Sequence, residues 1–379
     1  MLISPHMKPV ADVFFKQGQA SPKGGSALAI YQNGELVLDV WQGTASVGHP
    51  WNKHTSSLVF SSTKGLVAIL ANQLIELGLL DPEQKVSYYW PSFAQFGKAE
   101  IPVKWILQHK AGLSAVRRDL SFEELIDGTT VVEELAAQEP LWAPGSAHAY
   151  HSLTFGHLVG ELIRSVTGKT IGAFFHDQIA KPLGVPAWIG TPQNQLSNVA
   201  ELVTDGNRSS MQPPKYSPQY WIEKSMTFGK ALPIEIAGPG TGFNDERLLT
   251  SELAGAGGVM TAKALAKIYS AVVTNTDGIR LLDDETIREA IKPQTFGPSI
   301  WGEPGPWPIR GMGFMLPVPG FREMIGDTSF GHDGLGGQQG FGDLEHRIGF
   351  AYATSFLSSG ETEQKNQQQI IAALQDVVG

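Results

Sequence analysis

The sequence contains no cysteine among its 379 residues. This absence excludes disulfide bonds, iron–sulfur clusters and cysteine-ligated zinc. The ten histidines are scattered and no H-E-x-x-H motif occurs, so a catalytic zinc site has little support. The sequence therefore favours chemistry that needs neither a metal nor an organic cofactor.

Basic clusters and long apolar runs are missing as well. Lys and Arg together number 28 against 37 for Asp and Glu, which gives a net charge of −9 and no run of positive charge. A nucleic-acid partner is therefore not expected. No stretch reaches the roughly 18 apolar residues of a membrane span, and the N-terminal segment has no apolar core of signal-peptide length. We expect a soluble protein that stays in the cytoplasm without a membrane partner; the oligomeric state is left open.

Three common active-site motifs are also absent. The G-x-S-x-G nucleophile elbow does not occur, which disfavours an α/β-hydrolase. "TGKT" at residues 167–170 resembles the end of a phosphate loop, but Ile163 stands where that loop needs a glycine. The glycines after His332 do not fit G-x-G-x-x-G, and no strand–turn–helix pattern surrounds them, so a dinucleotide site is not indicated.

The patterns that are present indicate strands near both ends of the chain and helices between them. Two apolar runs flank Asn33-Gly34, which is the strongest short signal for a hairpin. The glycine-rich segment 330–356 has the short apolar runs of another hairpin. An apolar helix is predicted over residues 60–78, and most periodic segments within 81–292 are helical. If the terminal strands share one sheet, a cleft between sheet and helices would suit a small-molecule site.

The start of the apolar helix carries Ser61 and Lys64, which lie three residues apart. Positions i and i+3 share one face of a helix, about 5–6 Å apart at Cβ. A serine becomes a nucleophile when a neighbouring base takes its proton, and burial and the helix dipole both lower the pKa of a lysine. The N–H groups near Ser61 would suit a developing oxyanion. The alternative interpretation is a capping serine followed by a surface lysine.

Two further segments carry candidate partners for this pair. In "WAPGSAHAYHS", Tyr150 and Ser152 follow a Pro-Gly turn, and a tyrosine beside a serine–lysine pair can relay a proton to a leaving group. In "FGHDGLGGQQGF", His332 stands among glycines that let a strand edge approach a ligand. The backbone of Gly334 or Leu335 would then supply a second oxyanion donor. Taken singly, each segment favours a structural interpretation: Tyr150 as a partly buried residue at the start of a helix, and the glycines around His332 as a turn.

Together these motifs resemble the serine β-lactamase and penicillin-binding-protein superfamily, specifically its class C-like branch with the family VIII carboxylesterases. The resemblance runs over nearly the whole chain and includes "GELVLDVWQG", "FSSTKG", "ILQHKAGL", W-x-P-G-x4-Y-x-S, "GELIRSVTG", "IAKPLGV" and "GHDGLGGQQGFGDLEHRIGFAY". It implies a β-lactamase/transpeptidase-like fold, α/β plus all-α, in which an antiparallel sheet flanked by helices carries an inserted helical domain. Residues 1–80 and 293–379 would form the α/β domain, residues 81–292 the mainly helical domain, and the active site would lie in the cleft between them.

The same resemblance implies a role for each candidate residue. Ser61 of the S-x-x-K motif would be the nucleophile that accepts the acyl group, Lys64 its base, and Tyr150 the residue that passes a proton to the leaving group. The backbone N–H groups of Ser61 and Leu335 would form the oxyanion hole. Residues 332–334, His-Asp-Gly, stand where β-lactamases of this group have Lys-Thr-Gly.

Two departures from the family pattern bear on the substrate. Ser152 stands where class C β-lactamases have an asparagine, whose amide helps to hold the amide side chain of the substrate. His332 replaces a lysine, and a mostly neutral histidine offers a carboxylate no permanent charge. Neither change touches Ser61, Lys64 or Tyr150. We therefore expect a serine carboxylesterase of the family VIII type that hydrolyses short-chain or otherwise neutral esters through a covalent acyl-enzyme.

Several alternatives stay open on the sequence. The same site could act on amides, as a β-lactamase, D-aminopeptidase or oligoamide hydrolase does, or could pass the acyl group to another alcohol. A catalytically inactive binding protein is less favoured, because Ser61, Lys64 and Tyr150 are intact. The Trp- and Pro-rich segments 213–222 and 297–310 would wall an acyl or alcohol pocket, or serve only as structural loops. The sequence does not tell whether Lys64 or Tyr150 is the resting base.

Overall fold

The fold is centred on a seven-stranded antiparallel sheet with the strand order β1-β3-β2-β13-β12-β11, and β4 pairs with β3. The computed structural model describes residues 1–20, 23–204, 213–233, 236–357 and 360–379. All strands of this sheet come from the two ends of the chain: β1 (Leu2–Ile3), β2 (Gly25–Gln32), β3 (Glu35–Ser46), β4 (His49–Pro50), β11 (Ser329–Asp333), β12 (Gln339–Asp343) and β13 (Ile348–Thr354).

Both predicted hairpins are confirmed. Asn33 and Gly34 have φ values of 52° and 85°, and a two-residue turn with both centres in the left-handed region matches the twist of its flanking strands. They connect β2 to β3. Within the second segment, β11, β12 and β13 pair in sequence, and the 3-10 turn η5 (Leu335–Gly337) joins the first two of these strands.

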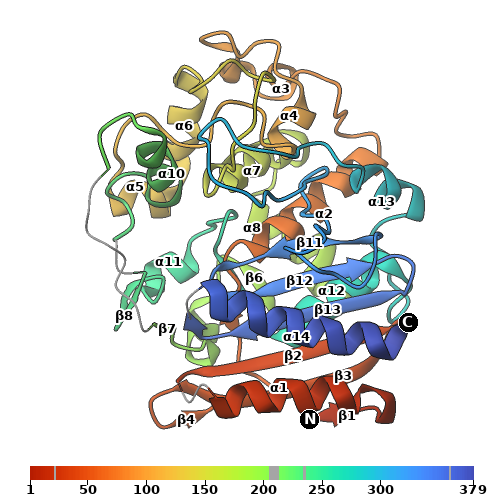
Figure 1. Cartoon of the computed structure of the whole chain (residues 1–379). Helices are drawn as coiled ribbons and strands as arrows, with labels where there is room; N and C mark the ends of the chain where they lie inside the picture. The colour runs from red at the N-terminus through yellow and green to blue at the C-terminus, as the bar shows by residue number, and fades with distance from the viewer. Residues whose placement is uncertain (21–22, 205–212, 234–235, 358–359) are drawn as a thin grey trace.

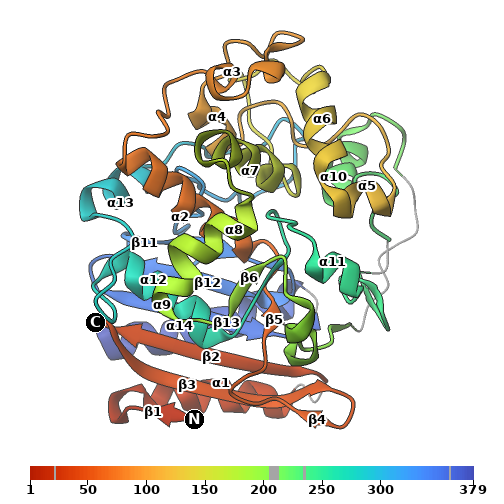
Figure 2. The ribbon, with the colours of Figure 1, turned by 180° about the vertical axis from the view of Figure 1, so that it is seen from behind.

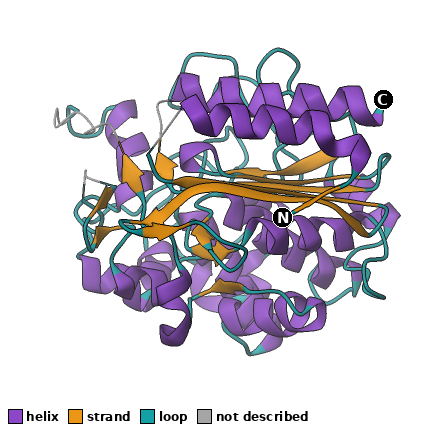
Figure 3. Ribbon diagram, turned by 90° about the horizontal axis from the view of Figure 1, so that it is seen from below, coloured by secondary structure: helices purple, strands orange, loops and turns teal. Residues whose placement is uncertain are grey.

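Helices cover both faces of the large sheet. In the edge-on view of Figure 3, α1 (Lys8–Ala20) and α14 (Gly360–Val378) lie side by side on one face. On the other face α12 (Ala262–Val273) packs against β13, β2 and β12, as the view from behind shows (Figure 2). A Cβ on Gly349 of β13 would lie 2.2 Å from the carbonyl oxygen of Ala266, so the absence of a side chain there lets α12 lie directly on the sheet.

The other helices gather mainly in a layer above the sheet in the view of Figure 1. The bounds of the helices in the middle of the chain, apart from α2 and α12, are α3 (Val86–Tyr89), α4 (Val103–Leu107), α5 (Phe122–Asp127), α6 (Thr129–Ala137), α7 (Thr154–Thr167), α8 (Ile171–Phe175), α9 (Lys181–Leu183), α10 (Pro218–Thr227), α11 (Glu246–Thr250) and α13 (Asp284–Ala290). Short strands pair in three small groups: β5 (Ser57–Leu58), β10 (Gly258–Met260) and β6 (Ala187–Ile189); β7 (Val203–Thr204) and β14 (Phe356–Leu357); β8 (Ala237–Gly238) and β9 (Thr241–Gly242).

Helix α2 (Ser62–Glu76) lies between the helical layer and the sheet, where it contacts both α7 and β11 (Figure 1). Its three leucines, its valine and Ile69 are all buried, and apolar residues that are buried all around a helix indicate a helix inside a core. It ends at Glu76, and Gly78 just beyond the C-cap has a φ of 67°, the left-handed conformation that commonly follows a helix. The helix predicted over residues 60–78 is therefore confirmed.

The division into two domains stays a prediction. Helix α12 falls within the range 81–292 that was assigned to the helical domain, yet its buried face packs on the sheet. The boundary at 292 does not match these contacts, because α12 has the apolar face that the sheet needs for cover.

Among the described residues, no helix is long and apolar enough to cross a membrane. A cytoplasmic location also stays a prediction.

Candidate active site

Ser61 follows a residue in a sparsely populated backbone conformation. Phe60 has a φ of +45°, which a bulky side chain rarely adopts, and its buried ring packs against Phe243 with centroids 4.9 Å apart. Ser61 then occupies the N-cap position of α2, but its side chain makes no capping hydrogen bond. The interpretation of Ser61 as a capping residue is therefore wrong.

The hydroxyl of Ser61 is instead the partner of Lys64. The Nζ of Lys64 lies 3.0 Å from the Oγ of Ser61 and donates to the carbonyl oxygen of Gly255 at 2.6 Å. Lys64 is completely buried, so it is not the surface lysine of the alternative interpretation, and within the described residues it has no carboxylate partner. Burial lowers the pKa of Lys64 well below its usual range, and the charge of Arg310 lowers it further. Such an amine can accept the proton of a hydroxyl that it touches.

The residues between Ser61 and Lys64 fix the first turn of α2 in place. The Oγ of Ser62 donates to the carbonyl oxygen of His332 at 2.9 Å, which attaches the helix to β11. The hydroxyl of Thr63 donates to the carbonyl oxygen of Phe60 at 2.6 Å and accepts from the N–H of Gly258 at 2.9 Å. The polar start of this apolar helix therefore makes buried contacts to the turn before it and to two distant segments of the chain.

Tyr150 faces the serine–lysine pair from the loop before α7. The Nζ of Lys64 lies 4.9 Å from the centroid of its ring. One ring neighbour is His332 of β11, which stacks on Tyr150 with centroids 6.0 Å apart, and another is His109 at 5.2 Å. The N–H of His151 donates to the Nδ1 of His109 at 3.1 Å, which holds the backbone beside Tyr150. Tyr150 is thus positioned by groups from three separate elements.

Tyr150 and His332 are both neutral near pH 7. Burial raises the pKa of Tyr150 to about 12, although a hydrogen bond with Ser61 and the charge of Arg310 act against this rise. Burial also lowers the pKa of His332 to about 3. Its Nδ1 lies 2.7 Å from the carbonyl oxygen of Asp333. Because a carbonyl only accepts, Nδ1 carries the proton and the buried Nε2 is an acceptor, which has no partner among the described residues.

The end of β11 brings backbone donors to Ser61. A Cβ on Gly334 would lie 2.3 Å from the carbonyl oxygen of Val59, so this position requires glycine and the strand end touches the turn before the serine. Leu335 follows at the start of η5 and is 40% exposed. Within the described part of the chain, the backbone N–H groups of Ser61 and Leu335 have no hydrogen-bond partner. Free N–H groups on one pocket are the donors that an oxyanion needs.

These groups share one cavity of about 350 Å³ between β11 and the helical layer. Of the predicted site residues, Ser61, Tyr150, Ser152, His332, Gly334 and Leu335 line it, whereas Lys64 lies behind Ser61 and is not part of the wall. Much of the remaining wall is apolar and consists of Phe60, Leu153, Met226, Leu232, Pro233, Ile236, Phe243, Ala256, Pro308 and Met315. An apolar cavity with a few converging polar groups suits a small organic ligand.

Comparison with known proteins agrees with this geometry. The family model described as Beta-lactamase matches residues 11–375. The chain belongs to this family. It is 33% identical over 361 residues to "Esterase/beta-lactamase LipL" of Mycobacterium tuberculosis (strain ATCC 25618 / H37Rv), which covers 89% of this chain and 78% of that protein.

Solved structures with this fold are similar to the chain over its whole length. A family VIII carboxylesterase superposes with a TM-score of 0.88 at 29% identity, covering 100% of this chain and 99% of that chain. EstA from Arthrobacter nitroguajacolicus Rue61a superposes with a TM-score of 0.87 at 30% identity, covering 100% and 98%. The predicted fold class and the resemblance to the esterase branch of the β-lactamase superfamily are therefore confirmed.

One of the two segments predicted to wall the pocket of this β-lactamase-family protein does so. Segment 297–310 lines the cavity through Pro308 and Arg310. Segment 213–222 does not line it: its Trp221 stacks on Trp301, with ring centroids 6.4 Å apart, and the pocket wall is instead formed by residues further along α10. Aromatic packing between the two segments explains their composition better than substrate contact does.

Arg310 is a pocket residue that the sequence analysis missed. Its guanidinium carbon lies 5.1 Å from the ring centroid of Tyr150, and the side chain is buried. It is the last residue of segment 297–310, for which the sequence analysis considered only the Trp and Pro residues. The irregular loop gives no periodic signal from which the inward direction of this side chain could be predicted.

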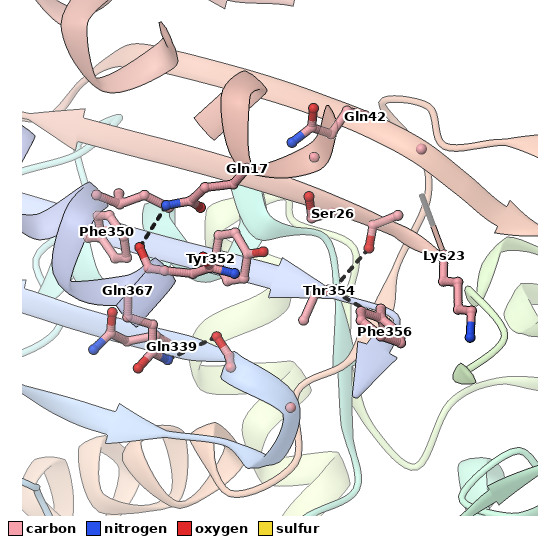
Figure 4. A pocket seen from close by; sticks show the side chains of 18 residues that line it. Gln17, Lys23, Ser26, Gln42, Gln339, Phe350, Tyr352, Thr354, Phe356 and Gln367 are labelled. Carbon is pink, nitrogen blue, oxygen red and sulfur yellow. Dashed lines mark hydrogen bonds between the residues drawn. The ribbon is translucent and has the colours of Figure 1, made fainter. Parts of the chain in front are cut away.

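A second and smaller cavity, of about 100 Å³, lies where α1 and α14 meet the edge of the sheet (Figure 4). Amide side chains bridge the elements around it: the Nε2 of Gln17 donates to the carbonyl oxygen of Asn366 at 2.9 Å, and the Nε2 of Gln367 donates to that of Gly337 at 3.0 Å. The second contact attaches α14 to η5, the turn that begins with Leu335. This contact therefore helps to hold η5, and with it the end of β11 beside Ser61, in position.

Proposed function

We propose that the protein is a serine carboxylesterase that hydrolyses small esters through a covalent acyl-enzyme on Ser61. The observation that carries this proposal is the 3.0 Å contact between the hydroxyl of Ser61 and the buried amine of Lys64, which has no carboxylate partner within the described residues. The similarity to an "Esterase/beta-lactamase" and to a family VIII carboxylesterase supports an ester as the substrate.

In the acylation step, Lys64 takes the proton of Ser61 while the Oγ forms a bond to the ester carbonyl carbon. The electron pair of the carbonyl moves to its oxygen, and the N–H groups of Ser61 and Leu335 donate hydrogen bonds to this oxyanion. The raised pKa of Tyr150 keeps its phenol protonated at rest, which supports Lys64 as the resting base.

The tetrahedral intermediate then collapses. The bond from the carbonyl carbon to the alcohol oxygen breaks, Tyr150 gives its proton to that oxygen, and the ammonium of Lys64 returns a proton to the phenol. A water molecule reverses the sequence: its proton passes to the base, its oxygen attacks the acyl carbon, and Ser61 leaves with a proton to release the acid.

An amide-directed activity is the second candidate. The name of the LipL relative includes β-lactamase beside esterase, and the same serine, lysine and tyrosine would open a β-lactam ring. A ring-opening assay with a chromogenic β-lactam distinguishes the two: turnover that matches the rate on a p-nitrophenyl ester would favour the amide-directed enzyme.

The main test is a rapid-mixing trace of p-nitrophenyl butyrate hydrolysis by the wild type and by Ser61→Ala. We expect nitrophenol to be released in the wild type, with a burst equal to the enzyme concentration if deacylation is slow, and to be lost in Ser61→Ala. A serine-directed phosphonate should add its mass to the peptide that contains Ser61 and to no peptide of the variant. Equal hydrolysis by both proteins would exclude the mechanism.

A further inference from the structure

Arg310 is a buried arginine held on a fixed backbone beside the reacting groups. Its N–H donates to the carbonyl oxygen of Thr295 at 3.1 Å, and its carbonyl oxygen accepts from the N–H of Thr295 at 3.1 Å. Its side chain is 8% exposed and lines the cavity that also contains Ser61. The guanidinium therefore does not reach bulk solvent, and it can meet only what enters the pocket.

Within the described residues, no side chain neutralises this guanidinium. Arg310 has no ion pair and no side-chain hydrogen bond, and its Nε is buried without a partner. Glu303 is close enough to influence the pKa of Arg310, but its carboxylate accepts a hydrogen bond from Ser299 and forms no ion pair with the arginine. Burying an unpaired charge costs free energy, so an arginine in this state indicates that its partner arrives with a ligand.

A second buried arginine in the same region provides the contrast. Arg322 makes two hydrogen bonds to the carboxylate of Asp333, at 2.7 and 2.8 Å. The Nε2 of Gln339 donates to the same carboxylate at 3.1 Å. Asp333 lines the pocket, yet its charge is already used by Arg322. Of these two arginines, Arg310 is therefore the one whose positive charge has no carboxylate partner within the described residues.

The other groups near Arg310 add no negative charge. Tyr150, over whose ring the guanidinium lies, is protonated, and His332 is neutral. Lys64 holds its proton weakly. A guanidinium offers a planar set of donors that matches a carboxylate in a two-point contact. The cavity therefore combines apolar walls with one cation, which suits a ligand that is apolar along its length and anionic at one end.

We propose that Arg310 binds a carboxylate of the substrate, so that the enzyme prefers esters that carry a second, free carboxylate group. This inference rests on the proposed esterase function and specifies its substrate class. It departs from the expectation of neutral esters, which followed from the histidine that stands at position 332 in place of a lysine, because here the positive charge comes from a different segment of the chain.

The test compares pairs of esters. Each pair has one anionic and one neutral member, and the two members share either the acyl group or the leaving group. For a carboxylate on the alcohol side, 4-(butyryloxy)benzoate is compared with 4-(butyryloxy)benzamide. For a carboxylate on the acyl side, mono-4-nitrophenyl adipate is compared with 4-nitrophenyl hexanoate. We expect the wild type to have the higher kcat/KM for the anionic member of at least one pair, and the pair concerned identifies the side that faces Arg310.

Arg310→Gln should lower this anionic-to-neutral ratio of kcat/KM by about 10-fold or more, and Arg310→Lys should retain part of the preference. Arg288→Gln removes an equal charge from an exposed position on α13 and should leave the ratio unchanged. A thermal melt identifies any variant that has failed to fold. A further measurement needs no catalysis: the binding of adipate or 4-hydroxybenzoate is compared between Ser61→Ala and the double variant Ser61→Ala/Arg310→Gln.

Two results would overturn the inference. One is a wild type that prefers the neutral ester in both pairs. The other is an equal fall for both esters in Arg310→Gln, which would make Arg310 a residue that acts only through Lys64 and Tyr150. In either case turnover of the neutral esters that depends on Ser61 would leave the proposed function intact. Loss of phosphonate labelling and of all ester turnover would instead remove the proposed function itself.

Discussion

The hydroxyl of Ser62 donates a hydrogen bond to the backbone carbonyl of His332 across 2.9 Å, and so joins the first turn of α2 to the strand that ends beside it. Two adjacent serines thus have different environments: the hydroxyl of Ser61 lines the pocket, whereas that of Ser62 is buried in the contact between helix and sheet. This difference permits a test in which each serine serves as the control for the other.

Ser61→Ala should abolish ester hydrolysis, by about 10³-fold or more, and leave the free energy of unfolding nearly unchanged. Ser62→Ala should lower the free energy of unfolding by about 1 kcal/mol, because a buried hydrogen bond is lost, and should retain ester hydrolysis. Urea denaturation and rapid-mixing kinetics of the two variants check this. The reverse assignment, with stability lost in Ser61→Ala and activity lost in Ser62→Ala, would contradict the geometry.

The acylation rate should rise with pH as Lys64 loses its proton. Below its pKa the amine is protonated and cannot take the proton of Ser61; above it the amine is free to do so, and the pKa is lowered by burial and by Arg310. Arg310→Gln removes the second of these effects, so its profile on a neutral ester should shift to higher pH. Single-turnover rates measured from about pH 5 to 9 check this, and an unshifted profile in the variant would count against the electrostatic link.

His332 should contribute no ionisation to the pH profile at ordinary pH. Its pKa is lowered to about 3, so the ring stays neutral throughout the range in which the enzyme is assayed. Replacement by Gln should change the size of kcat/KM on a neutral ester but not the shape of its dependence on pH. If a wild-type ionisation with a pKa of about 6–7 disappears in His332→Gln, the histidine is titrating and this prediction fails.

Gly65 and Tyr269 offer a double-mutant test of the packing behind the site. A Cβ on Gly65 would lie 2.1 Å from the hydroxyl oxygen of Tyr269, which is buried without a partner among the described residues. Gly65→Ala should therefore destabilise the fold by about 1–3 kcal/mol. Tyr269→Phe removes the clashing and unpaired oxygen, so it should be neutral or stabilising alone and should restore most of the loss in the double variant. Urea denaturation of the four proteins measures the coupling.

Two further glycines should respond in opposite directions to alanine. In Gly334→Ala the new Cβ would meet the carbonyl oxygen of Val59 at 2.3 Å, which forces β11 away from Ser61 and should reduce both stability and activity. In Gly160→Ala, within α7, the nearest atom would be 3.7 Å away, and the helix should gain about 0.5–1 kcal/mol. Melting temperatures and ester turnover check both, and a harmless Gly334→Ala would show that the contact has room to relax.

Local features of the chain were enough to predict the elements and the serine–lysine pair. Asn33-Gly34 predicts its hairpin because few residues other than Asn, Asp and Gly tolerate the turn geometry. Ser61 and Lys64 meet because helix geometry alone brings positions i and i+3 together. For such features the physical cause lies within a few residues of sequence, and the structure agrees with the prediction.

Contacts between distant segments could not be derived in this way. Tyr150 and His332 are separated by nearly half of the chain, and only the resemblance to a known family placed them in one site. Arg310 lies in an irregular loop, where neither periodicity nor a turn motif tells which side chain points inward. For the segments that contain Trp221 and Trp301, pocket wall and structural loop both stay open on the sequence, because an aromatic residue suits a ligand and a neighbouring ring equally well.

The pairing of Ser26 with Thr354 has a consequence for how the protein is made. The hairpin of β2 and β3 leaves the ribosome about 300 residues before its neighbour β13. The nascent chain must therefore keep one edge of this hairpin unpaired through most of synthesis, and exposed strand edges are prone to associate with other chains. Ser61 likewise emerges long before Leu335, so a nascent chain that has not yet released Leu335 has the candidate nucleophile with only one of its two candidate oxyanion donors. The proposed active site can therefore form only after the strand that ends beside Ser61 has been made.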